Sequence, residues 1–335
     1  MSIKNIKNKF WLTLVAIIFT LTSCVHNKKD ATISKKIKTE KPKDIKNIEN
    51  TKEKIKKEKD VITIWIHGTK MMGLQDHIFK DFFFRIVGLH NINEYLDKHK
   101  ITKLAKQLSE QNTHRFEYNN FYVYGWSGEL SHEARKIAAK DLHRVTLELI
   151  QNYTQKNGVI PKIRLITHSH GGNVALNMTK INKQSQDKIS IYELILLACP
   201  VQQKTAHFVS EGMFEKVYSL YSELDMLQII DPQGLHKFKN KEKKPLFSER
   251  MFAPEEKITQ AKIRINGRSI MHIEFITERF AKLLPNILYE LDQWDQQEAK
   301  EATITNKRKC LSINVDKKNT VFNKKYLVKR KTKYN

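Results

Sequence analysis

Apolar, β-branched runs alternate with helical patterns along the middle of this chain, and no other feature of the sequence constrains the fold as much. The runs that predict strands lie at residues 61–68, 120–128, 162–169, 189–200, 215–225 and 261–267. The spacing of apolar residues predicts helices at residues 101–111, 131–153, 173–182 and 274–300. Strands that alternate with helices form a mostly parallel sheet with helices on both faces. The sequence therefore predicts an α/β fold.

Lysine-rich segments lie on either side of this region. The chain has 335 residues and a formal net charge of +24, and much of the excess falls in residues 27–60 and 301–335. Basic arms beside a nearly neutral body are typical of solvated tails, so we expect no nucleic-acid partner. Within the second arm, two stretches, residues 310–315 and 324–328, are compatible with short edge strands.

The N-terminus has the parts of an export signal. A basic segment precedes the apolar run "WLTLVAIIFTL", which is short for a membrane span. The run ends in "LTSC", and this resembles the lipobox of a bacterial lipoprotein signal, in which the cysteine, here Cys24, is lipidated and becomes the new N-terminus. The resemblance implies export and attachment to a bacterial membrane through fatty acyl chains such as palmitate. An uncleaved anchor with an incidental cysteine is the alternative.

Val25, in place of Asp, favours the outer membrane and a periplasm-facing domain if the cell is Gram-negative. The predicted organisation of the chain is therefore a signal peptide at residues 1–24, a flexible tether at 25–60, a globular domain at 61–300 and a basic tail at 301–335.

A buried strand, a short polar turn and the start of a helix follow one another in "IRLITHSHGGNVALN", residues 163–177. Ser169 lies in the turn, before Gly171 and Gly172. This is the layout of a nucleophile elbow, G-x-S-x-G, although Thr167 takes the place of the first glycine. A serine in such a turn becomes nucleophilic when a neighbouring base accepts its proton. The alternative, a helix N-cap, explains neither the glycine pair nor the flanking histidines.

Other reactive residues follow the later predicted strands, and loops at the carboxyl ends of parallel strands gather such groups. Asp225 ends the fifth strand and His272 follows the sixth. An imidazole accepts a proton near neutral pH, and a carboxylate on its other nitrogen fixes its tautomer. The chain therefore offers a Ser-His-Asp triad with Ser169. Glu223 and Asp231 compete for the role of the acid, and a structural histidine at a helix start is the alternative for His272.

With these residues the chain resembles the α/β-hydrolases of the lipase and esterase type, over most of residues 61–298. The resemblance rests on "HGT", "YGWSGELS" leading into "RKIAAKDL", "THSHGGNVA", "YSELDMLQ" and "MHIEF". It implies an α/β-hydrolase fold in which Ser169 is the nucleophile, His272 the base and Asp225 the acid. It also implies that the backbone N–H groups of Thr69 and His170 hold the oxyanion.

The function implied by this resemblance is hydrolysis of carboxylic esters, with lipids among the candidate substrates. The reaction passes through an acyl-enzyme and needs no metal or organic cofactor. Two alternatives use the same residues. Transfer of the acyl group to an acceptor other than water makes an acyltransferase, and a catalytically inactive α/β-hydrolase is a tethered binding protein. Thr167 is the only feature that favours the inactive form.

Three further histidines flank the predicted site. His67 is predicted to brace the oxyanion loop. His168 and His170 raise the question of a zinc site, but neighbours on a tight turn point apart and no acidic or cysteine cluster accompanies them. Residues 71–89, rich in Phe and Met, form either a lid or acyl pocket or a core-packing helix. Residues 228–260 form either a surface loop or a lid.

Overall fold

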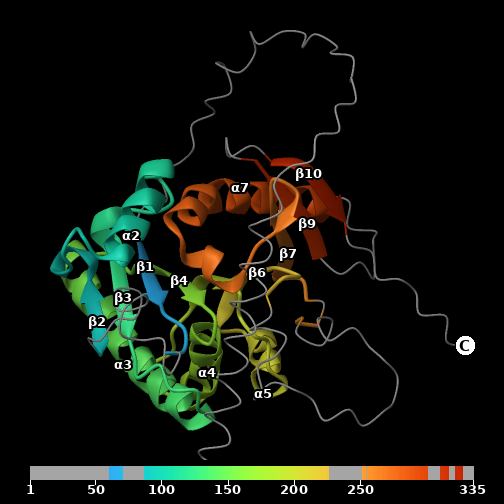
Figure 1. Ribbon diagram of the computed structural model, residues 1–335. Helices are drawn as coiled ribbons and strands as arrows, with labels where there is room; N and C mark the ends of the chain where they lie inside the picture. The colour runs from blue at the N-terminus through green and yellow to red at the C-terminus, as the bar shows by residue number, and fades with distance from the viewer. Residues whose placement is uncertain are drawn as a thin grey trace, which may run out of the picture. The chain divides into compact units, whose positions relative to one another are not determined.

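A ten-stranded mixed sheet runs through the described part of the chain (Figure 1). The computed structural model describes residues 60–70, 87–225, 251–253, 255–300, 310–316 and 321–326, all of which belong to one compact unit. The strands are β1 Val61–Ile66, β2 Gly88–Asn91, β3 Phe121–Gly125, β4 Lys162–His168, β5 Ile191–Leu197, β6 Phe214–Tyr221, β7 Ile258–Ile265, β8 Arg268–Ser269, β9 Cys310–Val315 and β10 Val321–Tyr326.

The strand order is β10-β9-β7-β6-β5-β4-β1-β3-β2, with β8 attached to β7. All pairs from β9 to β3 are parallel, whereas β2 and β10 are antiparallel at the two edges. β1 lies between β3 and β4, and all six of its residues are buried because helices cover both of its faces. The predicted α/β fold with a mostly parallel sheet is confirmed.

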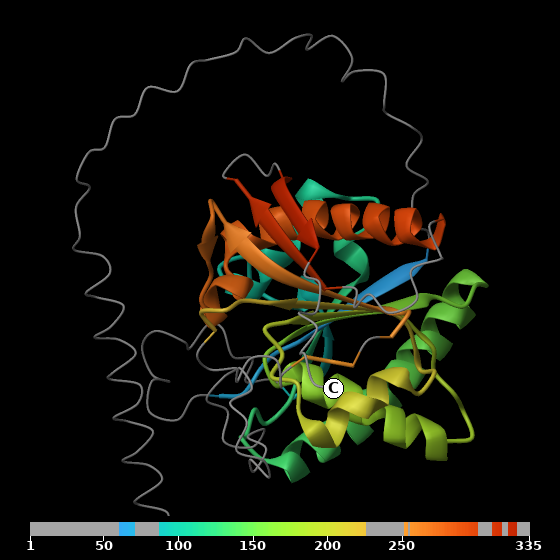
Figure 2. The ribbon, with the colours of Figure 1, turned by 90° about the vertical axis from the view of Figure 1, so that its right-hand side faces the viewer.

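Helices cover the sheet on its two faces (Figure 2). The longer helices are α2 Lys100–Gln111, α3 His132–Asn157, α4 Gly171–Gln184 and α7 Glu278–Lys300, and a short helix, α5, spans Gln203–Ala206. Side chains of β1 alternate between the two layers, as the period of a strand requires. Ile62, Ile64 and Ile66 join the core formed with α3 and α4, whereas Trp65 joins the core formed with α2 and α7.

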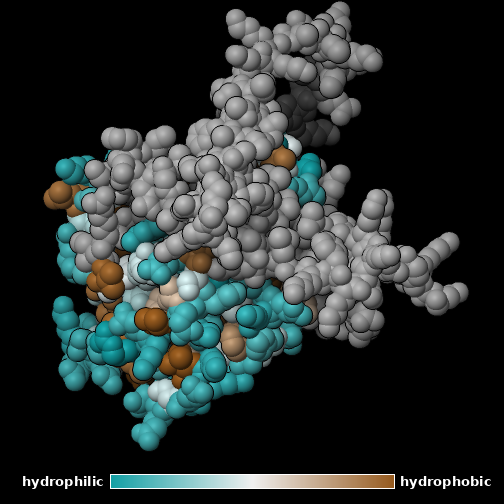
Figure 3. Space-filling view, turned by 60° about the horizontal axis from the view of Figure 1, so that its bottom comes forward, coloured by the Kyte–Doolittle hydropathy of each residue, from teal (hydrophilic) through white to brown (hydrophobic). Residues whose placement is uncertain are grey.

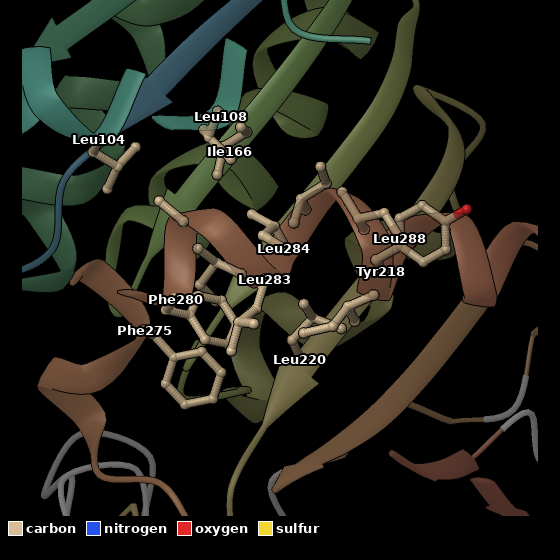
Figure 4. Close-up of a cluster of buried hydrophobic side chains, with 14 of the residues drawn as sticks. Leu104, Leu108, Ile166, Tyr218, Leu220, Phe275, Phe280, Leu283, Leu284 and Leu288 are labelled. Carbon is tan, nitrogen blue, oxygen red and sulfur yellow. The ribbon is translucent and has the colours of Figure 1, made fainter. Parts of the chain in front are cut away.

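The layer on the side of α7 is an apolar core (Figure 4). Phe280, Leu284 and Leu288 are spaced four residues apart on α7, which places them on one face of the helix. They are at most 1% exposed and share a cluster with Ile166 of β4 and Leu220 of β6. This packing holds the carboxyl-terminal helix against the middle of the sheet.

The outer surface is mainly polar. On the face shown in Figure 3, the described residues are mostly hydrophilic, with small and separate hydrophobic patches. α3 has the matching sequence pattern, because Ala138, Leu142 and Thr146 are buried at four-residue spacing while its other faces carry charges. No helix in the described part of the chain is long and apolar enough to cross a membrane.

All the strands and helices predicted in residues 61–300 are present, and the sheet also extends beyond them. β9 and β10 lie in the segment that composition assigned to a basic tail, so the sheet does not end at residue 300. β9 joins β7 in parallel, and Ile313 and Val315 enter the core. The predicted edge strand at 324–328 overlaps the end of β10. Residues 1–59 with Cys24, and most of the two candidate lids, lie outside the described residues.

Charged side chains meet in the core near the amino ends of β4, β5 and β6. Arg164 of β4 is fully buried and pairs with the carboxylate of Glu193 on β5, which also binds Arg115 from the loop after α2. Arg115 reaches on to Asp292 of α7, and the Nζ of Lys216 lies 2.6 Å from the same carboxylate. Burial alone would raise the pKa of Glu193, but the two guanidinium groups keep it below its ordinary value. The network therefore joins the sheet to α7 at the end opposite the candidate site.

Glu193→Gln tests the contribution of this network. The change removes the negative charge between two buried guanidinium groups, so we expect the free energy of unfolding to fall by about 3–5 kcal/mol. Glu215→Gln is the matched control, because Glu215 is exposed on β6 and accepts a hydrogen bond from Ser190. That change should stay within about 0.5 kcal/mol. Urea unfolding measures both. Equal effects of the two substitutions would contradict a stabilising role for the buried network.

Candidate active site

Ser169 lies in the turn between the last residue of β4 and the first residue of α4. Its φ is +53°, a region that a residue with a side chain rarely adopts. Two backbone hydrogen bonds hold the turn. The N–H of Ser169 donates to the carbonyl of Leu197 at 2.9 Å, and the N–H of Gly172 donates to the carbonyl of Ser169 at 3.0 Å. Strain of this kind costs on the order of 1–3 kcal/mol and persists only where the surroundings fix it. The conformation is that of a nucleophile elbow.

The two glycines after this turn allow the helix to approach the sheet. A Cβ on Gly171 would lie 2.6 Å from the carbonyl oxygens of Ile66 and His67 at the end of β1. A Cβ on Gly172 would lie 2.4 Å from the Sγ of Cys199, which follows β5. Neither position has room for a side chain, so α4 can begin this close to the strands only with glycine at both places.

Thr167, at the position of the first glycine of the motif, belongs to β4 rather than to the turn. It pairs with Ile66 on one side and Leu196 on the other, and it is fully buried. Its hydroxyl donates to the carbonyl of Ile195 at 3.5 Å. A β-branched residue suits this position because its backbone is that of an ordinary central strand.

Asp225 and His272 come together from two separate loops. Asp225 follows β6 and its carboxylate is fully buried, while His272 begins a 3₁₀ helix, His272–Ile276, after β8. The Nδ1 of His272 lies 2.8 Å from Oδ2 and 2.9 Å from Oδ1 of Asp225. A carboxylate only accepts, so Nδ1 carries the proton and Nε2 is the nitrogen that remains to accept another.

The competing acids do not make this contact. Glu223 binds Lys262 at 2.7 Å and Arg264 at 3.0 Å, both on β7. Asp231 lies outside the described residues. Of the three candidate acids, Asp225 is the one that the described part of the structure brings to His272.

The predicted oxyanion loop, residues 67–70 after β1, is fastened to the loop after β3. The indole N–H of Trp126 donates to the carbonyl of His67 at 2.8 Å, and the N–H of Lys70 donates to Gly128 at 2.7 Å. The ring of His67 stacks on the ring of Trp126. Its Nε2 accepts a hydrogen bond from the backbone N–H of Trp126, and its Nδ1 lies 2.7 Å from the carbonyl oxygen of Gly68. The proton of His67 is therefore on Nδ1, and burial lowers the pKa of its ring to about 4. His67 braces the loop as a neutral ring.

Thr69 lies in the same loop, two residues after His67. Its hydroxyl is buried, and among the described residues it has no hydrogen-bond partner. A buried hydroxyl without a partner is costly, so its presence here calls for an explanation.

His168 and His170 point toward different parts of the protein. The Nε2 of His168 lies 3.2 Å from the carbonyl oxygen of His272, whereas the Nδ1 of His170 lies 3.3 Å from the amide nitrogen of Asn173. In the described residues, no group of three or more His, Cys, Asp or Glu side chains is arranged to hold a metal ion.

Two residues that support the site were not predicted. Trp126 holds the oxyanion loop, and its place in "YGWSG" directly after a predicted strand was a usable signal. Asn173, buried in the first turn of α4, donates to the carbonyl of Pro200 at 3.0 Å and accepts from the hydroxyl of Thr205 at 2.7 Å. It joins the loop after β5 to α4, and no local pattern in the sequence marks it.

The lowered pKa of His67 predicts a pH dependence of stability. The unfolded chain binds a proton at this ring near pH 6.5 and the folded protein only near pH 4, so stability is lost as pH falls through this range. Relative to His67→Gln, the free energy of unfolding of the wild type should fall by about 3 kcal/mol between pH 7 and pH 4.

Urea unfolding at several pH values measures this difference, with His207→Gln as the control because His207 is exposed. The control should follow the wild-type curve. Parallel curves for the wild type and His67→Gln would show that His67 is not buried as a neutral ring.

Residues 43–275, more than half of the chain, match the family model of the PGAP1-like alpha/beta domain. No curated protein matches the sequence significantly. Among solved structures, phospholipase PlaB from Legionella pneumophila is similar at 17% identity and a TM-score of 0.24, over 42% of this chain and 25% of that one. Lipase B from Aspergillus fumigatus is similar at 9% identity and a TM-score of 0.36, over 69% of this chain and 52% of that one.

The product of the gene lin2722 from Listeria innocua is similar at 10% identity and a TM-score of 0.37, over 76% of this chain and 98% of that one. This chain thus spans from a quarter to about half of the length of the phospholipase and the lipase. The family match and the architecture of the sheet lead to one conclusion: the chain belongs to the PGAP1-like α/β domain family and has the α/β-hydrolase fold.

Proposed function

We propose that this protein is a serine hydrolase that cleaves carboxylic esters, with lipid esters among its substrates. The observation that carries the proposal is a strained serine turn beside a histidine whose Nδ1 is bound to a buried carboxylate. The two parts are adjacent, because the ring of His168, the residue before Ser169, lies 4.6 Å from the ring of His272. A nucleophile, a base and an orienting acid are the groups that acyl transfer requires.

In the proposed reaction, Ser169 Oγ attacks the ester carbonyl while Nε2 of His272 accepts its proton. The tetrahedral intermediate collapses, the bond to the alcohol oxygen breaks, and His272 returns the proton to the leaving alkoxide. Water then attacks the acyl-enzyme and gives a proton to His272. The bond from Ser169 to the acyl group breaks, Ser169 recovers its proton, and the carboxylic acid leaves. Asp225 stabilises the imidazolium that forms in each half-reaction.

The oxyanion of the intermediate is proposed to accept from the backbone N–H groups of Thr69 and His170. His170 precedes α4, so the partial positive charge at the start of a 14-residue helix favours an anion there. Thr69 belongs to a loop that Trp126 and Gly128 hold in place, which provides the preorganisation that makes such donors effective. The Thr69 hydroxyl, which has no hydrogen-bond partner among the described residues, is a second donor on the same residue and supports an acceptor at this place.

Labelling with a fluorophosphonate, which reacts with activated serines, tests the proposal. We expect the wild type to be labelled, and both Ser169→Ala and His272→Ala to lose the label. Asp225→Asn should slow the labelling by about 10⁴-fold, because the isosteric amide favours the wrong tautomer of His272. Ser190→Ala and His207→Ala are matched controls on exposed residues and should react like the wild type.

If the folded wild type takes no label, the hydrolase proposal fails and the inactive binding protein becomes the better account. Product analysis separates the two active alternatives. A hydrolase releases the free carboxylic acid in water, whereas an acyltransferase forms product only when an acceptor alcohol or amine is added.

We also infer that the protein is a lipoprotein, exported and anchored to a bacterial membrane through Cys24. The basic segment, the short apolar run and "LTSC" support this, since they occur in the order that a lipoprotein signal requires. Each buried methylene of an acyl chain contributes about 0.8 kcal/mol, so a cysteine that carries several chains holds the protein firmly. The anchor brings the proposed ester hydrolase to a lipid surface.

Cys24→Ser tests the anchor. In cells supplied with an alkyne analogue of palmitate, we expect the wild type to incorporate the label and to lack residues 1–23, because lipidation and cleavage depend on this cysteine. The variant should carry no label and should keep those residues, as intact-mass measurement will show. Cys310→Ser is the control and should be labelled like the wild type. Equal labelling of wild type and Cys24→Ser would contradict the inference.

A further inference from the structure

The rings of two histidines pack against each other beside the Ser169 turn. His168 is the last residue of β4, and its ring centroid lies 4.6 Å from that of His272 at an interplanar angle of 51°. The Nε2 of His168 lies 3.2 Å from the backbone carbonyl oxygen of His272. A carbonyl only accepts, so Nε2 of His168 carries a proton and donates it. The side chain that precedes the nucleophile therefore holds the backbone of the base.

His168 makes this bond as a neutral ring. Burial, and then the neighbouring His272, lower the pKa of His168 well below its ordinary value. With the proton on Nε2, its Nδ1 is unprotonated. A neutral ring is the form that suits this place, because in the proposed reaction His272 becomes positively charged, and a second imidazolium 4.6 Å away would oppose that step.

His272 is thus held from two sides. Asp225, which follows β6, fixes its ring through Nδ1, and His168, which ends β4, fixes its backbone. The second contact also connects the base to the nucleophile, because one peptide bond joins His168 to Ser169. The relative position of Ser169 and His272 is then set by a covalent neighbour and one hydrogen bond.

We propose that His168 is a positioning residue that sets the place of His272 relative to Ser169. This inference rests on the proposed function. The nucleophile elbow does not require a histidine at this position, since the residue before the serine is variable in the G-x-S-x-G pattern. The triad does not require one either. A misplacement of about 1 Å between reacting groups can cost about 100-fold in rate, so a single hydrogen bond at this point has a large effect.

The test compares His168→Met, which keeps a similar length but has no donor, with His168→Gln, whose Nε2 can donate at a similar reach. His143→Met is the matched control, because His143 is also buried and its Nε2 lies 3.0 Å from Oδ1 of Asn182, away from Ser169. The full-length protein in detergent is used for all. The rate of fluorophosphonate labelling reports on the alignment of Ser169 and His272.

A second readout does not depend on activity. The Nδ1 proton that His272 shares with Asp225 gives a downfield proton resonance, and its position reports on how the ring is held. We expect His168→Met to react at least about tenfold more slowly than the wild type and to shift or broaden this resonance. His168→Gln should stay within about threefold of the wild-type rate and keep the resonance. His143→Met should lower the melting temperature but change neither readout.

Three results would overturn the inference. One is a His168→Met variant with wild-type labelling and an unchanged resonance, and another is an equal loss in His168→Met and His168→Gln. The third is an equal loss in His143→Met, which would show that any buried histidine has the same effect. The two readouts also separate this inference from the proposed function. If the wild type takes no label, but its resonance is present and only His168→Met perturbs it, the proposed function fails while the positioning of His272 by His168 is supported.

Discussion

The contact between the start of α4 and the end of β1 is a contact between backbones, and the arrangement of the site depends on it. Gly171 lies so close to the carbonyl groups of Ile66 and His67 that any side chain would collide with them. Because the helix begins there, the chain must turn sharply after β4, and the turn forces Ser169 to a positive φ. The same approach brings the oxyanion loop to the serine, since a Cβ on Gly68 would lie 2.7 Å from the Cβ of Ser169. The close approach therefore requires glycine at positions 68 and 171, and it produces the turn that holds the proposed nucleophile.

The two ends of the sheet have different properties. At the amino ends of β4 and β5, Arg164 and Glu193 form part of a buried network in which opposite charges are close to one another. At the carboxyl ends, the structure contains features that cost stability: a strained serine, histidines kept neutral by burial, and a Thr69 hydroxyl without a hydrogen-bond partner in the part of the chain that the structure describes. Strained and unsatisfied groups persist only where the rest of the fold supports them, and they gather at functional sites. The packing of α7 and the ion network supply that support.

Much of this arrangement was predictable from the sequence. Strong apolar runs identified the parallel strands, and their ends identified Ser169 and the Asp225–His272 pair, because parallel strands bring their carboxyl ends to one edge. The edges of the sheet were harder to predict. β2 has only four half-buried residues, so it has no strong local pattern. Residues 310–315 were compatible with an edge strand, but β9 lies inside the sheet between β7 and β10, and its pairing with β7 spans a long stretch of sequence. The contact of His168 with His272 spans 104 residues and depends on the tertiary structure alone.

In the proposed reaction, Ser169 reacts through His272 and the N–H groups of Thr69 and His170 hold the oxyanion. A crystal structure of the protein after reaction with a fluorophosphonate tests this most directly, because the tetrahedral phosphonyl group resembles the reaction intermediate. The account predicts a covalent bond from Ser169 Oγ to phosphorus and a phosphonyl oxygen within hydrogen-bond distance of the N–H groups of Thr69 and His170. It also predicts that Nε2 of His272 lies next to Ser169 Oγ. A phosphonyl oxygen that points to solvent, or a phosphonyl group on another residue, would contradict the account.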